Sequence, residues 1–437
     1  MATDCFVVNP GNGLNGTTTV PGDKSMSHRA VMFGALAQGV THVRKWLPAG
    51  DTLASLGAIR ALGVEIEREG EGELTIHGGQ LHEPQDTLDL VNAGTGIRLL
   101  TGIMVGQPFP SVLDGSEQLR HRPMNRIINP LRQMGAEISG VNGCAPLTVK
   151  PATLHGIHYD MPVASAQVKS SLLLAALFAQ GPTVITQPGP ARDHTERMMQ
   201  AMGVDLVMQG NTVTLVPGNP LKPMDFTIPG DASSAAFPVV AALIVPGSDI
   251  TLTNVNLNRT RTGIFEVLQA MGADLTITET GTEAGDPVGT IRAKYSQLKG
   301  VTVGGEVVVR MIDEFPIFMV ATLFAEGETV VRDAEELRVK ETDRLAVMTA
   351  ELVKFGAQIT ETKDGFSVKG VQTLTGTTVD GHDDHRLSMS LVVAGLAAQG
   401  ETTVLDAECA ADSFPGYAET MVALGADVVV RDLRVEA

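Results

Sequence analysis

Aromatic residues and cysteines are both scarce in this chain, and the few cysteines argue against two kinds of site. Phe, Trp and Tyr make up 4% of the 437 residues, whereas glycine occurs 47 times. Small side chains in such numbers favour helices packed closely on sheets. The three cysteines, Cys5, Cys144 and Cys409, are scattered and have no C-x-x-C spacing. They indicate neither a disulfide framework nor a thiolate metal site.

Long apolar runs are also missing. The longest, residues 237–245 and 391–398, are far shorter than the roughly 20 residues that span a bilayer, so we expect no membrane partner. The opening Met-Ala-Thr-Asp-Cys lacks the basic and apolar regions of a signal peptide. We therefore expect a cytoplasmic protein.

Basic residues are also fewer than acidic ones. Lys and Arg total 32 against 50 Asp and Glu, which gives a formal net charge of −18. Nucleic acid demands a basic surface, so we expect no nucleic-acid partner. A small anion is not excluded, because a few arginines can dominate the field inside a cleft. The chain is also longer than one compact core usually allows.

What the chain does have is a repeat. Six times, an apolar helix-like run ends at a glycine-centred break, a strand-like segment follows, and a second helix ends at glycine before another strand. The closing glycines, 68 to 84 residues apart, are Gly63, Gly135, Gly203, Gly272, Gly356 and Gly425. Each copy predicts the order βαβαββ, which indicates βαβ crossovers and an α/β fold. Repeats of this kind bury their apolar faces against neighbouring copies.

Two similar tripeptides suggest how the six copies are grouped. Pro21-Gly22-Asp23 and Pro229-Gly230-Asp231 open similar stretches, and Pro-Gly pairs favour tight turns. We therefore expect two domains of three repeats. Residues 22–230 form the first, and residues 1–21 with 231–437 form the second. Two unrelated Pro-Gly turns are the alternative.

The copies differ most just before their first helices. Helix starts carry unpaired N–H groups that favour anions, and three of the starts add basic or amide side chains, at residues 24–29, 92–98 and 165–170. Residues 120–126 and 192–196 bring further arginines. Capping or a solvated basic turn could explain each cluster taken singly.

The fifth copy is acidic. Asp313 and Glu314 precede a helix, where a carboxylate is a suitable base. Further on, residues 338–345 form the densest charge run of the chain. If this run is helical, Lys340 and Arg344 share one face and Glu341 lies beside it. An exposed helix with salt bridges is the alternative.

The fourth and sixth copies complete the set. Residues 231–234 (Asp-Ala-Ser-Ser) have no cation and predict capping alone, so we interpret this copy as structural. Residues 382–386 (His-Asp-Asp-His-Arg) could suggest a metal, but Arg386 is an unfavourable neighbour for a cation. We expect no metal. If the helices of each group are parallel, their starts meet on one face, and two such faces would enclose a positive cleft for substrates with phosphate and carboxylate groups.

The motifs, taken in order, closely resemble the 5-enolpyruvylshikimate-3-phosphate synthase family from end to end. The segments that carry the resemblance lie at residues 21–29, 92–95, 122–123, 165–167, 339–345 and 384–386. The forms Gly-Asp-Lys-Ser-x-Ser-His-Arg and Ser-Ala-Gln-Val-Lys look like the second class of bacterial enzymes, which contains glyphosate-tolerant members.

The resemblance implies a fold and a reaction. The fold is α/β, with two globular domains that are each built of three βαβαββ repeats (an inside-out α/β barrel), and with a substrate cleft between them. The enolpyruvyl group of phosphoenolpyruvate moves to the 5-hydroxyl of shikimate 3-phosphate, and phosphate is released. No metal or organic cofactor is needed, glyphosate is an expected inhibitor, and we expect a monomer.

The resemblance also implies roles for individual residues. The expected catalytic groups are Asp313 as acceptor of the hydroxyl proton, Glu341 as proton donor to the methylene carbon, and Lys24 as a second proton-transfer candidate. The residues expected to bind shikimate 3-phosphate are Ser25, Arg29, Ser165, Ala166, Gln167, Arg192, Asp313 and Lys340. Those expected to bind phosphoenolpyruvate are Lys24, Gly94, Thr95, Arg122, Gln167, Arg344 and Arg386.

Two positions bear on inhibition and binding. Asp412 stands where the first class of the family has a lysine that contacts phosphoenolpyruvate, so this contact is in question. Gly94 is the glycine whose replacement by alanine accompanies glyphosate tolerance in the family, and a methyl group there would point toward the phosphoenolpyruvate site. We therefore expect a glyphosate-sensitive enzyme.

Two alternatives stay open. The sister enolpyruvyl transferase that acts on UDP-N-acetylglucosamine shares the fold but uses a loop cysteine. Residues 113–124 contain none, and Cys144 lies in a strand-like context. A non-catalytic repeat protein that binds anions is the other alternative. Asp313 and Glu341 speak against it, because carboxylates weaken anion binding unless they do chemistry.

Overall fold

The computed structural model describes residues 4–432 and divides into two compact units. The first unit comprises Gly22–Pro229 together with Thr282–Asp286. The second comprises the chain up to Pro21, Gly230–Gly281 and the chain from Pro287 onward. The predicted boundaries need two changes, since Gly230 belongs to the second unit and the short segment 282–286 belongs to the first. Residues 1–3 and 433–437 of the predicted second domain lie outside the described part.

The first unit contains three four-stranded sheets and their helices. Its strands are β3 (Gly39–Arg44), β4 (Glu65–Arg68), β5 (Leu74–Gly78), β6 (Leu88–Asp89), β7 (Ser111–Asp114), β8 (Glu137–Val141), β9 (Cys144–Lys150), β10 (His158–Asp160), β11 (Thr183–Thr186), β12 (Asp205–Gln209), β13 (Thr212–Val216) and β14 (Phe226–Thr227). Its helices are α1 (Lys24–Leu36), α2 (Gly50–Ala61), α3 (Gly94–Met104), α4 (Glu117–Arg120), α5 (Asn125–Gln133), α6 (Ala166–Ala176) and α7 (His194–Ala201).

The second unit also contains three four-stranded sheets. Its strands are β1 (Asp4–Val8), β2 (Asn15–Thr18), β15 (Asp249–Asn256), β16 (Asp274–Glu283), β17 (Asp286–Lys294), β18 (Thr302–Val303), β19 (Glu328–Val331), β20 (Ile359–Thr362), β21 (Gly365–Lys369), β22 (Thr378–Asp380), β23 (Thr402–Leu405) and β24 (Val428–Asp432). Its helices are α8 (Ala232–Ile244), α9 (Gly263–Ala270), α10 (Glu306–Arg310), α11 (Phe315–Thr322), α12 (Arg344–Lys354), α13 (His385–Leu396) and α14 (Tyr417–Ala423), with 3-10 turns η1 (Glu335–Val339) and η2 (Ala407–Asp412).

One sheet topology recurs in both units. In the second repeat, β7 lies between β6, to which it is parallel, and β9, to which it is antiparallel. β8 then pairs antiparallel with β9 at the far edge. Because α3 connects the parallel pair β6 and β7, this part is a βαβ crossover. The predicted α/β fold of βαβαββ repeats is confirmed.

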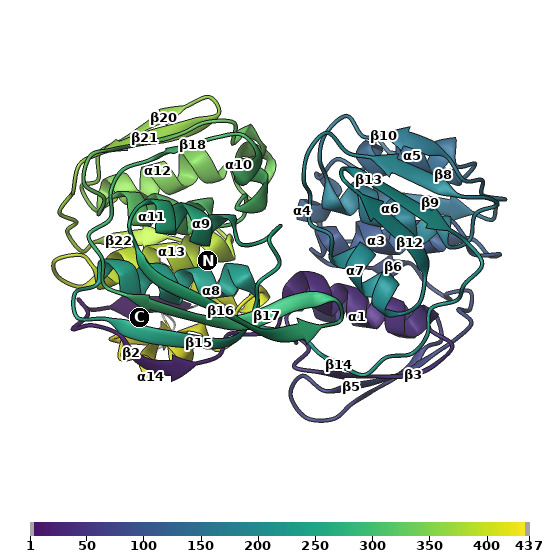
Figure 1. The fold of residues 1–437 in the computed structure, drawn as a ribbon, viewed down its shortest axis with the longest axis horizontal. Coiled ribbons are helices and arrows are strands. Elements are labelled where there is room, and N and C mark those ends of the chain that lie inside the picture. The colour runs from purple at the N-terminus through teal and green to yellow at the C-terminus, as the bar shows by residue number, and fades with distance from the viewer. Residues whose placement is uncertain (1–3, 433–437) are drawn as a thin grey trace. The chain divides into compact units, whose positions relative to one another are not determined.

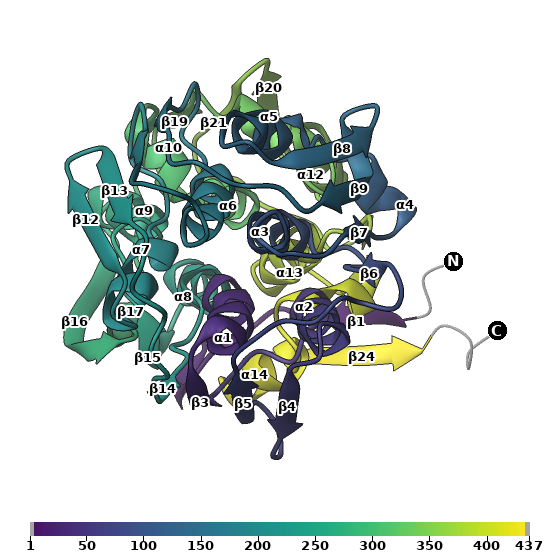
Figure 2. The ribbon, with the colours of Figure 1, turned by 90° about the vertical axis from the view of Figure 1, so that its right-hand side faces the viewer.

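Three helices fill the centre of each unit. They are α1, α3 and α6 in the first and α8, α11 and α13 in the second (Figure 1). In Figure 2 the helices α1, α3 and α6 are seen nearly end-on, with the sheets around them. All residues of α8 are buried, as its apolar run from Ala235 to Ile244 predicts. Hydrogen bonds join the starts of α1 and α6, of α3 and α6, and of α8 and α11, so polar helix starts gather together within each unit.

The two Pro-Gly-Asp tripeptides mark points where the chain passes between units. β2 precedes the first tripeptide and pairs with β15 of the second unit, whereas α1 follows it in the first unit. β14 precedes the second tripeptide and pairs with β3 of the first unit, whereas α8 follows in the second. The N–H of Asp23 donates to the carbonyl of Pro229 at 2.8 Å, and the N–H of Asp231 donates to that of Pro21 at 2.9 Å. The strand and the helix on either side of each tripeptide thus belong to different units.

Candidate active site

The start of α1 holds Lys24 beside a carboxylate. The side chain of Asp23 caps the helix and accepts from the N–H of Met26 at 2.9 Å. Lys24 Nζ lies 2.8 Å from Oδ2 of Asp51, and both side chains are about one-fifth exposed. Lys24 is therefore held at the accessible end of the helix rather than in the core. A lysine paired with a carboxylate at a helix start can bind an anion or exchange a proton.

Arg29 is buried one turn further along α1. Its guanidinium donates to Thr195 Oγ1 at 2.7 Å, to Ser170 Oγ at 3.0 Å and to the carbonyl of Ser25 at 2.7 Å. These bonds tie together three helices, α1, α6 and α7, and fix the direction of the guanidinium. The structure thus brings together two of the predicted substrate ligands, Ser25 and Arg29.

Charges near Arg29 offset the cost of burying it. Burial lowers the pKa of Arg29 to about 10, and the carboxylates of Glu196 and Asp23 oppose this shift. Arg192, partly buried just before α7, lowers the pKa further. Arg29 and Arg192 are therefore close enough to feel each other's charge, and Arg29 remains cationic at neutral pH.

The starts of α3 and α6 are joined through Gln167. Its side-chain amide donates to Thr95 Oγ1 at 3.0 Å, and its oxygen accepts from Arg98 Nη1 at 2.7 Å. Ser165 caps α6, with its hydroxyl accepting from the N–H of Val168 at 3.5 Å. Ala166 is the first residue of that helix. Thr95 and Gln167, which were predicted from different copies of the repeat, are therefore neighbours.

Gly94 and Arg122 lie against each other. A methyl group on Gly94 would come within 2.6 Å of Arg122 Nη1 and 3.4 Å of Arg98 Nη1. The absence of a side chain at Gly94 therefore leaves room for two guanidinium groups at the start of α3. A substituent there would move the end of the Arg122 side chain.

In the second unit, Asp313 lies beside two cations. Its Oδ1 is 3.4 Å from Arg344 Nη1 and 3.5 Å from Lys340 Nζ. Asp313 precedes Glu314, the N-terminal cap of α11. The structure thus places the predicted base next to Lys340, the predicted ligand of the acceptor substrate.

Arg344 is the centre of this group. It is buried and donates from Nε to Asp384 Oδ2 at 2.8 Å and from Nη2 to Glu341 Oε2 at 2.7 Å. Burial lowers the pKa of Arg344, but Asp384, Glu341 and Asp313 together raise it above the usual arginine value. The predicted proton donor and proton acceptor therefore share one arginine.

The predicted helix through residues 338–345 is wrong. The segment forms the end of η1 and then a loop, and α12 begins only at Arg344, with Asp343 as its cap. Lys340 and Glu341 lie in that loop, so they share no helix face with Arg344. The reason is local, because an Asp at a helix start competes for the backbone N–H groups that a continuous helix would use. Lys340 still reaches Asp313 from the loop.

The helix start of the sixth copy supports Arg344. Asp384 caps α13 and accepts from the N–H of Arg386 at 3.0 Å, while it also receives the guanidinium of Arg344. Arg386 is buried at the same helix start. Within residues 4–432 no group of three or more His, Cys, Asp or Glu side chains has the arrangement of a metal site.

The helix start of the fourth copy is capped, as predicted. Asp231 caps α8 and accepts from the N–H of Ser233 at 2.8 Å. The buried Arg261 donates to Asp231 Oδ1 and to Ser233 Oγ, both at 2.7 Å. Ser233 in turn donates to Glu314. This helix start is therefore occupied by the protein's own charges.

Three further residues of the site were not predicted as ligands: Asp51, Arg98 and Asp384. Asp51 and Asp384 act as partners of Lys24 and Arg344, and Arg98 orients Gln167. Arg98 and Asp384 stand inside motifs that the sequence singles out, so a signal was present. Asp51 follows Gly50 at the start of α2 and carries no distinctive pattern.

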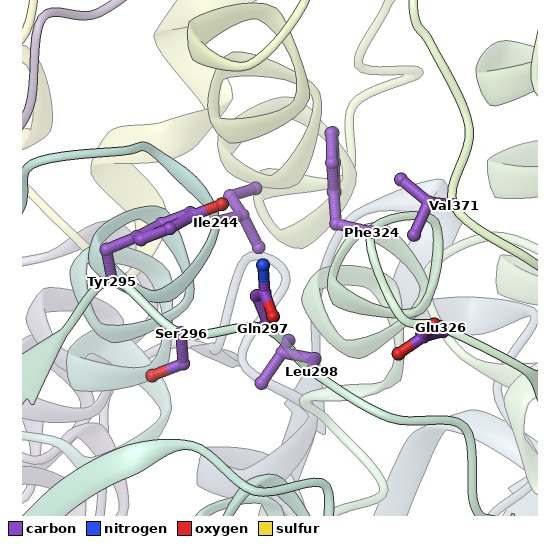
Figure 3. Close-up of a pocket in the computed structure, with 8 residues that line it drawn as sticks. All are labelled: Ile244, Tyr295, Ser296, Gln297, Leu298, Phe324, Glu326 and Val371. Atoms are coloured by element: carbon purple, nitrogen blue, oxygen red, sulfur yellow. The ribbon is translucent and has the colours of Figure 1, made fainter.

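One pocket of the second unit lies away from these residues. It has a volume of about 300 Å³ and includes Ile244, Tyr295, Gln297 and Phe324 in its wall (Figure 3). Ile244 ends α8 and Phe324 follows α11, so the pocket lies at the opposite ends of these helices from the charged starts. No predicted site residue lines it.

The described part of the chain contains no helix long and apolar enough to cross a membrane.

Residues 8–421 match the family described as EPSP synthase (3-phosphoshikimate 1-carboxyvinyltransferase). A relative from Geobacter sp. (strain M21), named 3-phosphoshikimate 1-carboxyvinyltransferase, is 51% identical over 94% of this chain and 97% of its own. A relative of the same name from Desulforamulus reducens is 47% identical over 95% and 98%.

A solved structure agrees with the sequence relatives. EPSP synthase from Acinetobacter baumannii matches 98% of this chain and 100% of its own, with 44% identity and a TM-score of 0.90. At this identity the likeness covers the sequence as well as the fold. The chain therefore belongs to the EPSP synthase (3-phosphoshikimate 1-carboxyvinyltransferase) family.

Proposed function

We infer that this enzyme transfers the enolpyruvyl group of phosphoenolpyruvate to the 5-hydroxyl of shikimate 3-phosphate and releases phosphate. The family and its curated relatives support the reaction. The observation that carries the assignment at the level of residues is the group around Arg344, where two carboxylates and a lysine lie within 3.5 Å of charged partners.

The chemistry requires one acid and one base. The 5-hydroxyl oxygen attacks the carbon that bears the phosphate while the neighbouring methylene carbon gains a proton. The phosphate then leaves with its bridging oxygen, and the new methyl group loses a proton to restore the double bond. We assign acceptance of the hydroxyl proton to Asp313 and donation to the methylene carbon to Glu341, with Lys24 as a second proton-transfer group.

Arg344 connects substrate binding to these proton transfers. Its Nη2 donates to Glu341 Oε2 at 2.7 Å. An anionic substrate on Arg344 would therefore lie next to the carboxyl group that we propose as the proton donor.

The basic and amide groups of the first unit supply the rest of the binding. We propose that Ser25, Arg29, Arg192 and the start of α6 bind shikimate 3-phosphate. We assign Thr95, Arg122 and Gln167 to phosphoenolpyruvate, together with Arg344 and Arg386 of the second unit. Well-oriented binding of the substrates can contribute up to about 7–11 kcal/mol of the barrier.

The acceptor substrate is tested by phosphate release. Wild-type enzyme is incubated with phosphoenolpyruvate and either shikimate 3-phosphate or UDP-N-acetylglucosamine. We expect phosphate only with shikimate 3-phosphate, and release only with the nucleotide sugar would overturn the assignment. The structure adds one argument against the sugar enzyme, since Cys144 begins β9 and pairs with Val141 within a sheet.

We further propose that the enzyme is sensitive to glyphosate. Gly94 leaves the space beside Arg122 open, and an inhibitor that replaces phosphoenolpyruvate would use the same cations. Asp412, at the end of η2, supplies no positive charge where the first class has lysine. Cytoplasmic location and a monomeric state stay predictions from the sequence.

A further inference from the structure

The hairpin of β16 and β17 has a short tip that belongs to the first unit. The tip is Thr282–Asp286, although both strands lie in a sheet of the second unit. Ala284 is buried within the apolar core of the first unit. The side chain of Glu283 accepts from the N–H of Thr227 at 3.1 Å. The tip is therefore packed and hydrogen-bonded rather than a loose turn.

Asp286 is the buried charge of this tip. It is 1% exposed, and its Oδ2 lies 2.6 Å from Nδ1 of His194, which is also buried. Arg197 approaches the other oxygen at 3.6 Å and donates to the carbonyl of Gly285 at 3.2 Å. A buried carboxylate is costly unless it is paired. Nδ1 of His194 carries the proton, because the carboxylate can only accept.

His194 is the first residue of α7, and the next two residues hold cations from other helices. Thr195 Oγ1 accepts from Nε of Arg29 at 2.7 Å. Glu196 Oε1 lies 2.6 Å from Nζ of Lys169, and both side chains are buried. The first turn of α7 therefore fixes one cation of α1 and one of α6.

The charge of Asp286 also reaches Arg29. Burial lowers the pKa of Arg29, and Asp286 is among the carboxylates that raise it again, after Glu196 and Asp23. Arg192 lies two residues before His194 in the sequence. The contact between Asp286 and His194 thus lies within electrostatic reach of Arg29 and two residues along the chain from Arg192, the two arginines that we assign to shikimate 3-phosphate.

We propose that Asp286 is a positioning residue for shikimate 3-phosphate. It holds His194 and, through His194, the first turn of α7, so that Arg29 and Arg192 keep the geometry in which they bind the substrate's anionic groups. The inference rests on the proposed function. It means that the tip of the β16–β17 hairpin, which belongs to the first unit, completes a binding site of that unit.

The test is the affinity for shikimate 3-phosphate alone, measured by calorimetry without phosphoenolpyruvate. Asp286→Asn removes the charge and one acceptor, and we expect the Kd to rise by about tenfold, as for loss of one charged hydrogen bond. Glu279→Gln is the matched control, because Glu279 is exposed on the same hairpin. It should leave the Kd unchanged.

Two variants of His194 separate positioning from mere stability. Asn can donate from a place close to that of His Nδ1, so His194→Asn should keep affinity near that of wild type. His194→Ala should lose affinity as Asp286→Asn does. The KM for phosphoenolpyruvate should change much less than that for shikimate 3-phosphate in all of them. Should Asp286→Asn fail to fold, the two His194 variants decide.

Three results would be decisive against the proposal. The first is a lower melting temperature of Asp286→Asn with an unchanged Kd, which would show a structural role only. The second is equal weakening by Glu279→Gln. The third is equal affinity of His194→Asn and His194→Ala. A wild-type protein that does not bind shikimate 3-phosphate would instead refute the proposed function.

Discussion

His28 is a fully buried histidine at the start of α1. Its Nδ1 lies 2.8 Å from Ser55 Oγ. Burial lowers its pKa from 6.5 to about 3, although Asp51 opposes the shift. Because the unfolded chain takes up a proton near pH 6.5 and the folded chain does not, stability is complete above pH 6.5 and falls as the pH decreases toward 3.

The difference between the pKa of His28 in the folded chain and in the unfolded chain predicts that stability depends on pH. Between pH 7.5 and pH 5, protonation of His28 in the unfolded state should cost wild type roughly 2 kcal/mol. His28→Asn, which can still bond Ser55, should lack this part of the loss. Urea denaturation at both pH values measures it, with His121→Asn at an exposed site as control. Equal losses for wild type and His28→Asn would refute the prediction.

Glu341→Gln tests the proposed proton donor. We expect turnover to fall by about 10²- to 10⁴-fold, the usual share of a general acid, while affinity for shikimate 3-phosphate stays within a few-fold. Glu335→Gln, in an exposed ion pair with Lys363, is the control. A protein that only binds anions would instead gain affinity on losing the charge of Glu341. Steady-state kinetics and calorimetry distinguish the two results.

Gly94→Ala tests the proposed sensitivity to glyphosate. The new methyl group would displace the end of Arg122, which is flexible, so the fold should persist while anion binding suffers. We expect the inhibition constant for glyphosate to rise by about tenfold or more, together with the KM for phosphoenolpyruvate. Gly57→Ala, in open space on α2, is the control. Equal inhibition constants for wild type and Gly94→Ala would contradict the steric explanation.

At the scale of residues, the sequence predicts which charged side chains belong to the site better than it predicts which side chains they contact. Asp313, Lys340, Glu341 and Arg344 were assigned to one site, and the structure brings them within contact of one another. Asp286 could not be found, because nothing in the local sequence of a hairpin tip indicates which distant histidine it will meet. Such pairs depend on packing between segments that are far apart along the chain.

At the scale of elements, the space around a glycine shows how closely its helix packs against a neighbouring helix. A methyl group on Gly102 of α3 would lie 2.2 Å from the carbonyl oxygen of Ser171 in α6. The obstacle is backbone, which cannot rotate away, so the helices themselves would have to separate. Gly57 of α2 meets nothing within 4 Å and is exposed.

The two glycines predict opposite effects of one substitution. Gly102→Ala should destabilise the protein by about 1–3 kcal/mol or more through overpacking. Gly57→Ala should stabilise it by roughly 0.4–1 kcal/mol, because alanine loses less backbone entropy in a helix. Chemical denaturation measures both. A stabilising Gly102→Ala would mean that α3 and α6 are not tightly packed.

Helices and strands follow the repeat where apolar periodicity is strong. The buried helices α1, α3, α6, α8, α11 and α13 coincide with the runs that the repeat predicts. The prediction failed at residues 338–345, where a dense charge run has the spacing of a helix but Asp343 caps the one that follows. Charge spacing alone does not show where a helix begins.

At the scale of the whole molecule, local and overall charge oppose each other. The formal net charge is −18, which repels anionic substrates at long range, while the helix starts are rich in cations. As salt rises from 0.01 M to 0.15 M, the Debye length falls from about 30 Å to about 8 Å.

The dependence of KM on salt shows whether the cations at the helix starts or the net negative charge of the protein dominates substrate binding. We expect the KM for both substrates to rise roughly threefold or more over this range, because close cation–anion attraction is screened. Turnover at saturating substrate should change little and serves as the control. A KM that falls with salt would mean that repulsion by the acidic surface controls binding.

The sequence predicts the number of repeats and their division into two groups, but not every boundary. The repeats can be counted because each one closes at a glycine in a similar local sequence. By contrast, β2 pairs with β15 and β14 pairs with β3, so neither strand pairs within the repeat that it precedes. Local patterns cannot distinguish that arrangement from pairing within the same repeat, since β2 has four residues and β14 only two.

β1 has a consequence for how the protein is made. This strand lies between β23 and β24, with Asp4 opposite Asp432. The first of the described strands therefore pairs with the last two along the chain. The second unit cannot complete this sheet until β24 has been synthesised, and in the meantime a strand rich in Phe and Val must stay soluble. We expect the nascent chain to need a chaperone on β1 until β23 and β24 have left the ribosome.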